Sequence, residues 1–264
     1  MDIHLSYLLF CSVILFANIM QGITGFAGTI LALPVSLMLV GYATARPILN
    51  VLGILSGIYV AVLNRHDVVW KELLKVCLVM LCGILLGIFL KKYVSGKERI
   101  LYIALGIFII LLSIQRMAQL FIHPKKIAVK NDGSIREIEK TPKHVRLSLV
   151  KDYAVLVFAG LIHGIFVCGG PLLIGYLSKI LKERKQFRAT ISCIWIFLNF
   201  FILVSDAVQG YWSYSLFKVL LMTVPFLWGG MKIGSLLYAY MNQKIFMLVT
   251  YILLFVSGLT LLIK

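Results

Sequence analysis

Two stretches of the chain place glycines and polar side chains inside strongly apolar surroundings. They are Gln21-Gly-Ile-Thr-Gly-Phe-Ala-Gly-Thr29 and His163-Gly-Ile-Phe-Val-Cys-Gly-Gly-Pro171. Glycine permits backbone conformations and close approaches that other residues forbid, so a helix could break in each stretch and restart directly after it. The restarted helix would present its positive N-terminal end and its free N–H groups at the break. The chemistry expected here is the binding of an anion without a charged side chain.

The candidate binding residues of the two stretches share a register. In the first stretch they are Gln21, Gly22, Thr24, Gly25, Gly28 and Thr29, and in the second they are His163, Gly164, Cys168, Gly169 and Gly170. At an offset of 142 residues the matching pairs are Gln21 with His163, Gly22 with Gly164, Gly28 with Gly170, Arg46 with Arg188, Trp70 with Trp212, and Gly87 with Gly229. This run of matches predicts that the second half of the chain repeats the first.

The composition indicates a membrane protein. The 264 residues are 61% hydrophobic and only 14% charged, and the mean hydropathy is +0.99. A soluble domain would be about a quarter charged. Because the charges gather in short clusters between apolar runs long enough to cross a bilayer, we expect a polytopic integral membrane protein.

The net charge of +16 raises the alternative of nucleic-acid binding. Most Lys and Arg lie within a few residues of an apolar segment, where they orient the helices and contact anionic lipid headgroups. The sequence holds no aromatic and basic platform and no recognition motif beside them. Membrane lipid is therefore an expected partner, and nucleic acid is not.

Ten apolar segments define the expected helices. They run over residues 5–23, 27–40, 46–63, 69–90 and 99–121 in the first half, and over 153–167, 171–181, 189–208, 214–238 and 245–263 in the second. The second segment of each half is too short to span about 30 Å of hydrocarbon at about 1.5 Å per residue. Each half is therefore expected to hold a glycine-broken helical hairpin followed by three transmembrane helices.

Loop charges predict the topology. The stretch 123–151 is rich in Lys and Arg, so it is expected as a cytoplasmic linker between a first repeat, 1–122, and a second repeat, 152–264. If the hairpin of each half enters and leaves on one side, both termini lie outside and the repeats are inverted relative to each other. The loop Lys91–Arg99 would then be external, although its four positive charges favour the opposite side.

Charged and aromatic residues at segment ends are expected as anchors. Arg46 and Arg188 would begin their spans at the two membrane faces, and Trp70 and Trp212 would lie in the interfacial aromatic belt. Asp206 is expected in an external loop at the end of its segment.

Polar residues inside the spans are the remaining site candidates. A polar group in hydrocarbon is costly unless it is satisfied, so Gln21 and His163 are expected to shape the site. His163 could take up a proton near neutral pH and couple transport to it, or it could stay neutral and bond a helix carbonyl. Asn50, Ser192 and Asn199 either line the cavity or only bond between helices.

The sequence does not indicate an enzyme. The five cysteines lie in apolar segments, and they form neither a C-x-x-C pair nor a cluster with metal-ligand spacing. The chain has no H-E-x-x-H, no G-x-S-x-G and no P-loop. We therefore expect no catalytic residues, no cofactor and no metal.

The stretch Gln21–Gly28 with Pro34 beyond it, together with Gly164–Pro171, resembles the paired motifs of the TauE/SafE sulfite exporter family. The resemblance covers nearly the whole chain, including the duplicated halves and the basic linker. It implies a multi-pass permease of the bacterial or archaeal inner membrane that moves small anions, typically sulfite, sulfonates or related organosulfur compounds.

Some positions depart from the family's pattern. Ala27 stands where many members have glycine, and Val167 and Cys168 replace small residues. With His163, Cys168 could therefore alter the substrate.

These expectations combine into one functional prediction. The chain should be an all-α secondary transporter with two inverted repeats and a central site for a small anion, driven by the membrane potential or by a coupled proton. The alternatives are a passive anion channel and a membrane-embedded subunit or enzyme of a larger complex. A homodimer is compatible with this interpretation.

Overall fold

The computed structural model describes residues 3–94, 142–166, 169–181 and 183–263, together with scattered positions between 103 and 118. Every regular element in these residues is a helix, which confirms the all-α prediction. They are α1 (Ile3–Thr24), α2 (Ala27–Val40), α3 (Tyr42–Leu63), η1 (Arg65–Asp67), α4 (Trp70–Val94), α6 (Pro142–Phe166), α7 (Gly170–Ile180), α8 (Arg184–Val208), α9 (Tyr214–Tyr240) and α10 (Gln243–Ile263). In this part of the chain five helices, α1, α3, α4, α8 and α9, are long and apolar enough to cross a membrane.

The helices α2 and α7 are short, as the apolar segments predict. They have 14 and 11 residues, or roughly 21 and 17 Å at about 1.5 Å per residue, so neither can cross about 30 Å of hydrocarbon. Between α1 and α2 the chain turns at Gly25, which has a φ of 83°. This left-handed conformation costs a residue with a Cβ about 1–2 kcal/mol, which explains why glycine stands at the turn.

The helix α6 begins earlier than its apolar segment predicts. It starts at Pro142, so the C-terminal part of the expected linker 123–151 is helical. Proline breaks a helix interior, but its fixed φ and missing N–H suit the first helical turn. The preceding residues, 119–141, lie outside the described part of the chain.

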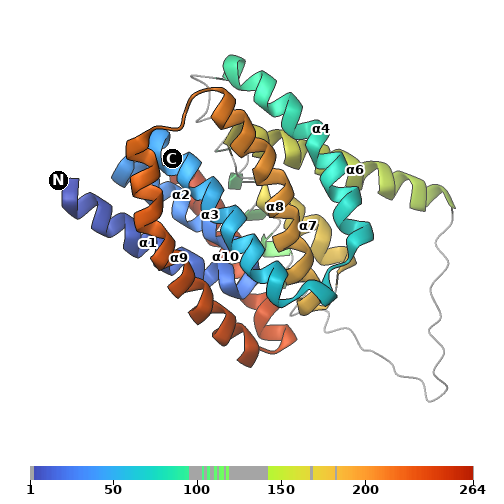
Figure 1. The fold of residues 1–264 in the computed structure, drawn as a ribbon. Helices are drawn as coiled ribbons and strands as arrows, with labels where there is room; N and C mark the ends of the chain where they lie inside the picture. Colours follow the sequence, from blue (N-terminus) through green and yellow to red (C-terminus); the bar gives the residue numbers. More distant parts are fainter. Residues whose placement is uncertain are drawn as a thin grey trace.

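The most extensive helix contacts join the two halves of the chain. The helix α1 packs on α9, α4 packs on α6, and α3 packs on α8. Figure 1 shows the first pair on one side, the second pair on the other, and α3 with α8 between them. A Cβ at Gly160 would clash with the Met80 carbonyl oxygen, and a Cβ at Gly234 would clash with that of Ile19. Such backbone contact is typical of helix packing in membranes.

The helices α3 and α8 face each other through two stripes of register mates. The α3 stripe is Arg46, Asn50, Gly53, Gly57, Val60 and Asn64, and the α8 stripe is Arg188, Ser192, Trp195, Asn199, Ile202 and Asp206. Spacings of three and four residues place each stripe on one helix face. Arg46, near the start of α3, pairs with Asp206 near the end of α8. Arg188, near the start of α8, donates to Asn64 just after α3. The two helices are therefore antiparallel.

The buried charges of these stripes correct two expectations. Arg46 and Arg188 are only 4% and 3% exposed, so they are internal contacts and not anchors at the membrane faces. Asp206 is buried and lies within α8, not in an external loop. A buried charge needs a partner. Asp206 of the opposite helix supplies it for Arg46, and Gly22, Asn64 and Ser235 supply neutral acceptors for Arg188. A single apolar segment does not reveal these partners.

Candidate functional site

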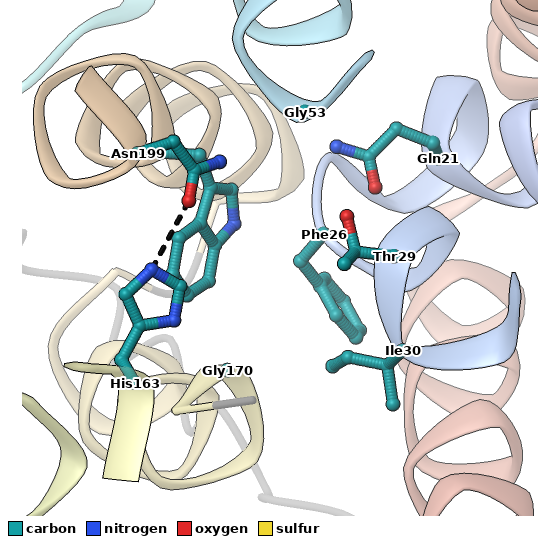
Figure 2. Close-up of a pocket in the computed structure, with 9 residues that line it drawn as sticks. Gln21, Phe26, Thr29, Ile30, Gly53, His163, Gly170 and Asn199 are labelled. Atoms are coloured by element: carbon teal, nitrogen blue, oxygen red, sulfur yellow. Dashed lines mark hydrogen bonds between the residues drawn. The ribbon is translucent and has the colours of Figure 1, made fainter. Parts of the chain in front are cut away.

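A small pocket lies between the two glycine stretches. In this conformation it has room for little more than a water molecule. It is lined by Gln21, Phe26, Thr29, Ile30, Gly53, His163, Gly170, Trp195 and Asn199. In Figure 2 the side chains of Gln21, Thr29 and Ile30 face those of His163 and Asn199 across the pocket. Both halves of the chain therefore contribute to its walls.

Side chains of the first stretch bond the N–H groups where α2 begins. The Thr24 hydroxyl accepts from Phe26 and Ala27, at 3.4 and 3.1 Å. The Oε1 atom of Gln21 accepts from the Gly28 N–H at 2.8 Å. Helix starts leave such donors without an intrahelical partner. In this conformation the protein itself thus occupies N–H groups that an anion was expected to use.

His163 has a corresponding role where α7 begins. Its Nδ1 atom accepts from the Gly169 N–H at 3.4 Å, and its Nε2 atom lies 3.1 Å from Oδ1 of Asn199. An Nδ1 atom that accepts a hydrogen bond leaves the proton of a neutral ring on Nε2, which can then donate to Asn199. The geometry fits a neutral imidazole, because a proton on Nδ1 would break the bond to Gly169.

The register mates Gln21 and His163 also link each break to the third helix of their own half. The Gln21 amide donates to the Ser56 hydroxyl of α3 at 3.3 Å. His163 reaches α8 through its bond to Asn199. Both side chains are therefore satisfied inside the protein, as buried polar groups need to be.

The structure brings five of the predicted binding residues to the pocket: Gln21, Thr29, His163, Gly170 and Asn199. Asn50 and Ser192 bond between helices instead. The Asn50 amide donates to the Asn199 carbonyl at 3.1 Å. The Ser192 hydroxyl donates to the Gly25 carbonyl at 3.4 Å. Thr24, Gly25, Gly28 and Gly169 form or cap the breaks, and Cys168 lies outside the described residues.

Gly22 and Gly164 are packing positions away from the pocket. A Cβ at Gly22 would lie 2.9 Å from the Met231 carbonyl oxygen of α9. A Cβ at Gly164 would lie 2.5 Å from the Ile84 carbonyl oxygen of α4. Each glycine lies inside a helix, before the break, so its contacts are with a neighbouring helix. In this conformation neither glycine lines the pocket, and both pack against a neighbouring helix.

Four lining residues were not predicted from the sequence: Phe26, Ile30, Gly53 and Trp195. They are apolar or lack a side chain, so within an apolar segment they resemble ordinary core residues. Spacing offers a signal for Trp195, which follows Ser192 by three residues and precedes Asn199 by four. This spacing places it on the polar face of α8.

The described residues that line the pocket include no charged side chain. They present amides, a hydroxyl, an indole and an imidazole. The hydrogen bonds of the imidazole fit its neutral form. The buried arginines lie toward the two ends of the α3–α8 contact, where other groups bond them. An anion at this place would meet hydrogen-bond donors and a helix dipole but no ion-pair partner, and the pocket would have to widen to admit it.

The chain was compared with known families and proteins. Residues 10–261 match the family described as Sulfite exporter TauE/SafE. This match covers nearly the whole chain and confirms the resemblance carried by the two glycine stretches. No match was found among curated proteins or among solved structures.

Proposed function

The chain belongs to the sulfite exporter TauE/SafE family, and we propose that this multi-pass membrane protein is a secondary transporter of a small anion. The family description suggests sulfite, a sulfonate or a related organosulfur compound as the substrate. The observation that carries the proposal is the pocket between the two breaks, because both halves of the chain line it.

The anion would lie between Gln21 and Thr29 on one wall and His163 and Asn199 on the other. The first turn of α7 begins at Gly170, beside the pocket, and its dipole favours negative charge there. At the start of α2, the anion would have to replace the side-chain acceptors that now bond the backbone. Binding would then be coupled to a rearrangement of the first break.

We further propose that the two halves are inverted repeats. Under the offset of 142 residues, the packing of α1 on α9 corresponds to that of α6 on α4. The contact of α3 with α8 corresponds to itself, as a contact on a twofold axis would. Movement of one repeat against the other across α3 and α8 would give alternating access.

The proposed orientation rests on loop charges. The basic stretch 123–151 would be cytoplasmic and both termini would lie outside the cell inner membrane. A proton taken up by His163 would release Gly169 at the start of α7, which offers a route for proton coupling. A homodimer is compatible with this arrangement.

Anion uptake by liposomes that contain the purified protein tests the proposal. The panel would hold sulfite, sulfate, methanesulfonate and acetate, each with and without a pH gradient and a membrane potential. Saturable uptake of a sulfur oxyanion that responds to one of these gradients is expected. Flux that is uncoupled and does not saturate would instead identify a passive channel, and no flux of any anion would contradict the proposal.

Two substitutions test the pocket itself. Gln21→Ala and His163→Ala should each raise the half-saturating concentration about tenfold or more, because a hydrogen bond to a charged group contributes about 1.5–3 kcal/mol. Gln209→Ala and His66→Ala are matched controls, since both side chains are exposed and away from the pocket. Wild-type uptake by both pocket variants would exclude these residues from the site.

A further inference from the structure

Trp195 combines burial with an unused hydrogen-bond donor. The residue is 6% exposed and lines the pocket between the breaks. Its indole Nε1 atom is buried and has no hydrogen-bond partner among the described residues. A buried donor without a partner loses its hydrogen bonds to water and gains none in return. This desolvation cost is why such donors are rare in native proteins. An acceptor supplied by a ligand would remove this cost.

The surroundings hold the indole in place. Its ring lies 5.1 Å from the His163 ring, between centroids, with the two planes tilted by 38°. His163 is itself fixed by its bonds to Asn199 and Gly169. The indole N–H is therefore held in position before an anion binds, so binding would cost little side-chain entropy.

The indole also lies beside the start of α7. A Cβ added to Gly170 would be 3.5 Å from Cζ2 of Trp195, and Cζ2 is two bonds from Nε1 in the indole. The unpartnered N–H and the positive end of an 11-residue helix thus meet at the same pocket. Two independent features therefore favour a negatively charged acceptor at this point.

We propose that the indole N–H of Trp195 donates a hydrogen bond to the bound anion at the start of α7, which makes Trp195 a specificity-determining residue. The inference rests on the proposed transport function and adds a residue that faces the substrate. An indole donates and never accepts, so the position requires an acceptor atom, and a charged oxyanion oxygen accepts a stronger bond than a neutral hydroxyl oxygen. The ligand class is a small oxyanion that presents a charged oxygen at this end.

The substitution Trp195→Phe removes the N–H and keeps an aromatic ring against His163. It should raise the half-saturating concentration for sulfite and for methanesulfonate in liposome uptake by about 10- to 100-fold, the loss expected for a hydrogen bond to a charged group. Trp212→Phe is the matched control, because that indole Nε1 is also buried without a partner among the described residues but does not line the pocket. The control should change the half-saturating concentration less than twofold.

A second measurement on the unaltered protein does not depend on how the variant folds. The chain has four tryptophans. A variant in which the other three are replaced with Phe serves only to assign the indole ¹⁵N–¹H resonance of Trp195, which is then followed in the unaltered protein. Addition of sulfite or methanesulfonate should move this resonance downfield and leave that of Trp212 in place.

The outcomes separate the two proposals. Saturable wild-type uptake with an unchanged Trp195→Phe variant and a stationary resonance would overturn the role of Trp195 and leave the transport function standing. A moving resonance without uptake of any anion would support the donor and overturn the transport function. A stationary resonance in a protein that takes up no anion would overturn both.

Discussion

At the scale of single residues, one backbone angle shapes the turn between α1 and α2. Gly25 has a φ of 83°, and a Cβ there would lie 2.8 Å from the Ser192 hydroxyl and 2.9 Å from the Arg188 carbonyl oxygen. We expect Gly25→Ala to lose stability both through the left-handed conformation, about 1–2 kcal/mol, and through crowding against α8. The midpoint of thermal unfolding in detergent measures the combined loss.

Gly41→Ala separates the two causes. Gly41 also has a left-handed φ, 75°, but a Cβ there would meet no heavy atom within 4 Å. This variant should therefore show only the conformational loss. If Gly25→Ala lost no more stability than Gly41→Ala, the contact between the turn and α8 would be too loose to matter.

Sequence reasoning at this scale identifies polar residues in register but not their contacts. Gln21 and His163 could be selected because each is polar, precedes a glycine and matches the other at a fixed offset. The ion pair of Arg46 and Asp206 could not be predicted, because the partners are 160 residues apart and a hydropathy pattern takes each charge as the end of a segment. Trp195 was missed because an aromatic residue in an apolar run resembles the core.

At the scale of helices, neighbouring glycines of α9 differ sharply in their surroundings. A Cβ at Gly230 would lie 2.5 Å from the Leu15 carbonyl oxygen of α1, whereas a Cβ at Gly229 would lie 3.6 Å from a Leu15 methyl group. Gly230→Ala should push α9 away from α1 and destabilise the protein by about 1–3 kcal/mol.

Gly229→Ala is the control for this contact. It should be neutral or slightly stabilising, because alanine favours a helix by about 1 kcal/mol over glycine. Thermal unfolding of the two variants side by side measures the difference. Equal midpoints would mean that α1 and α9 do not pack as closely as the structure indicates.

The elements themselves were predictable where apolar composition defines them. The lengths of α2 and α7 follow from apolar runs that start at a glycine stretch and end at a loop. The start of α6 at Pro142 could not be predicted from hydropathy, because the residues that follow it are polar. The offset also pairs Gly87 with Gly229, although within α9 it is Gly230 that lies closer to α1 than Gly229 does. Sequence register could not show this, because it ignores how a helix rotates against its neighbour.

At the scale of the whole molecule, the helix pairings repeat but the side chains do not. Trp195 has Gly53 as its register mate, and both line the same pocket. Asp206 has Asn64 as its register mate, so an ion pair at one end of the α3–α8 contact corresponds to an arginine bonded to a neutral acceptor at the other. The sequence register predicts duplication, whereas these chemical differences gain meaning only once the two stripes are seen to face each other.

The end of the α3–α8 contact that holds Arg188 offers a test of how the two halves move. Arg188 there donates to the Asn64 amide oxygen at 3.0 Å and to the Ser235 hydroxyl and the Gly22 carbonyl at 2.8 Å, all neutral acceptors. Asn64→Asp would give this end an ion pair like that of Arg46 and Asp206. The carboxylate would add a Coulomb attraction to the guanidinium that the neutral amide lacks, so the thermal midpoint should rise.

The same substitution should slow anion uptake by liposomes several-fold, because alternating access across α3 and α8 would require the new ion pair to break in every cycle. Asn64→Ala is the opposite control: it removes the bond to Arg188 and should lower the thermal midpoint. If Asn64→Asp raised the midpoint and uptake kept its wild-type rate, this end of the contact would stay closed during transport. The opening that moves the anion would then have to lie elsewhere in the molecule.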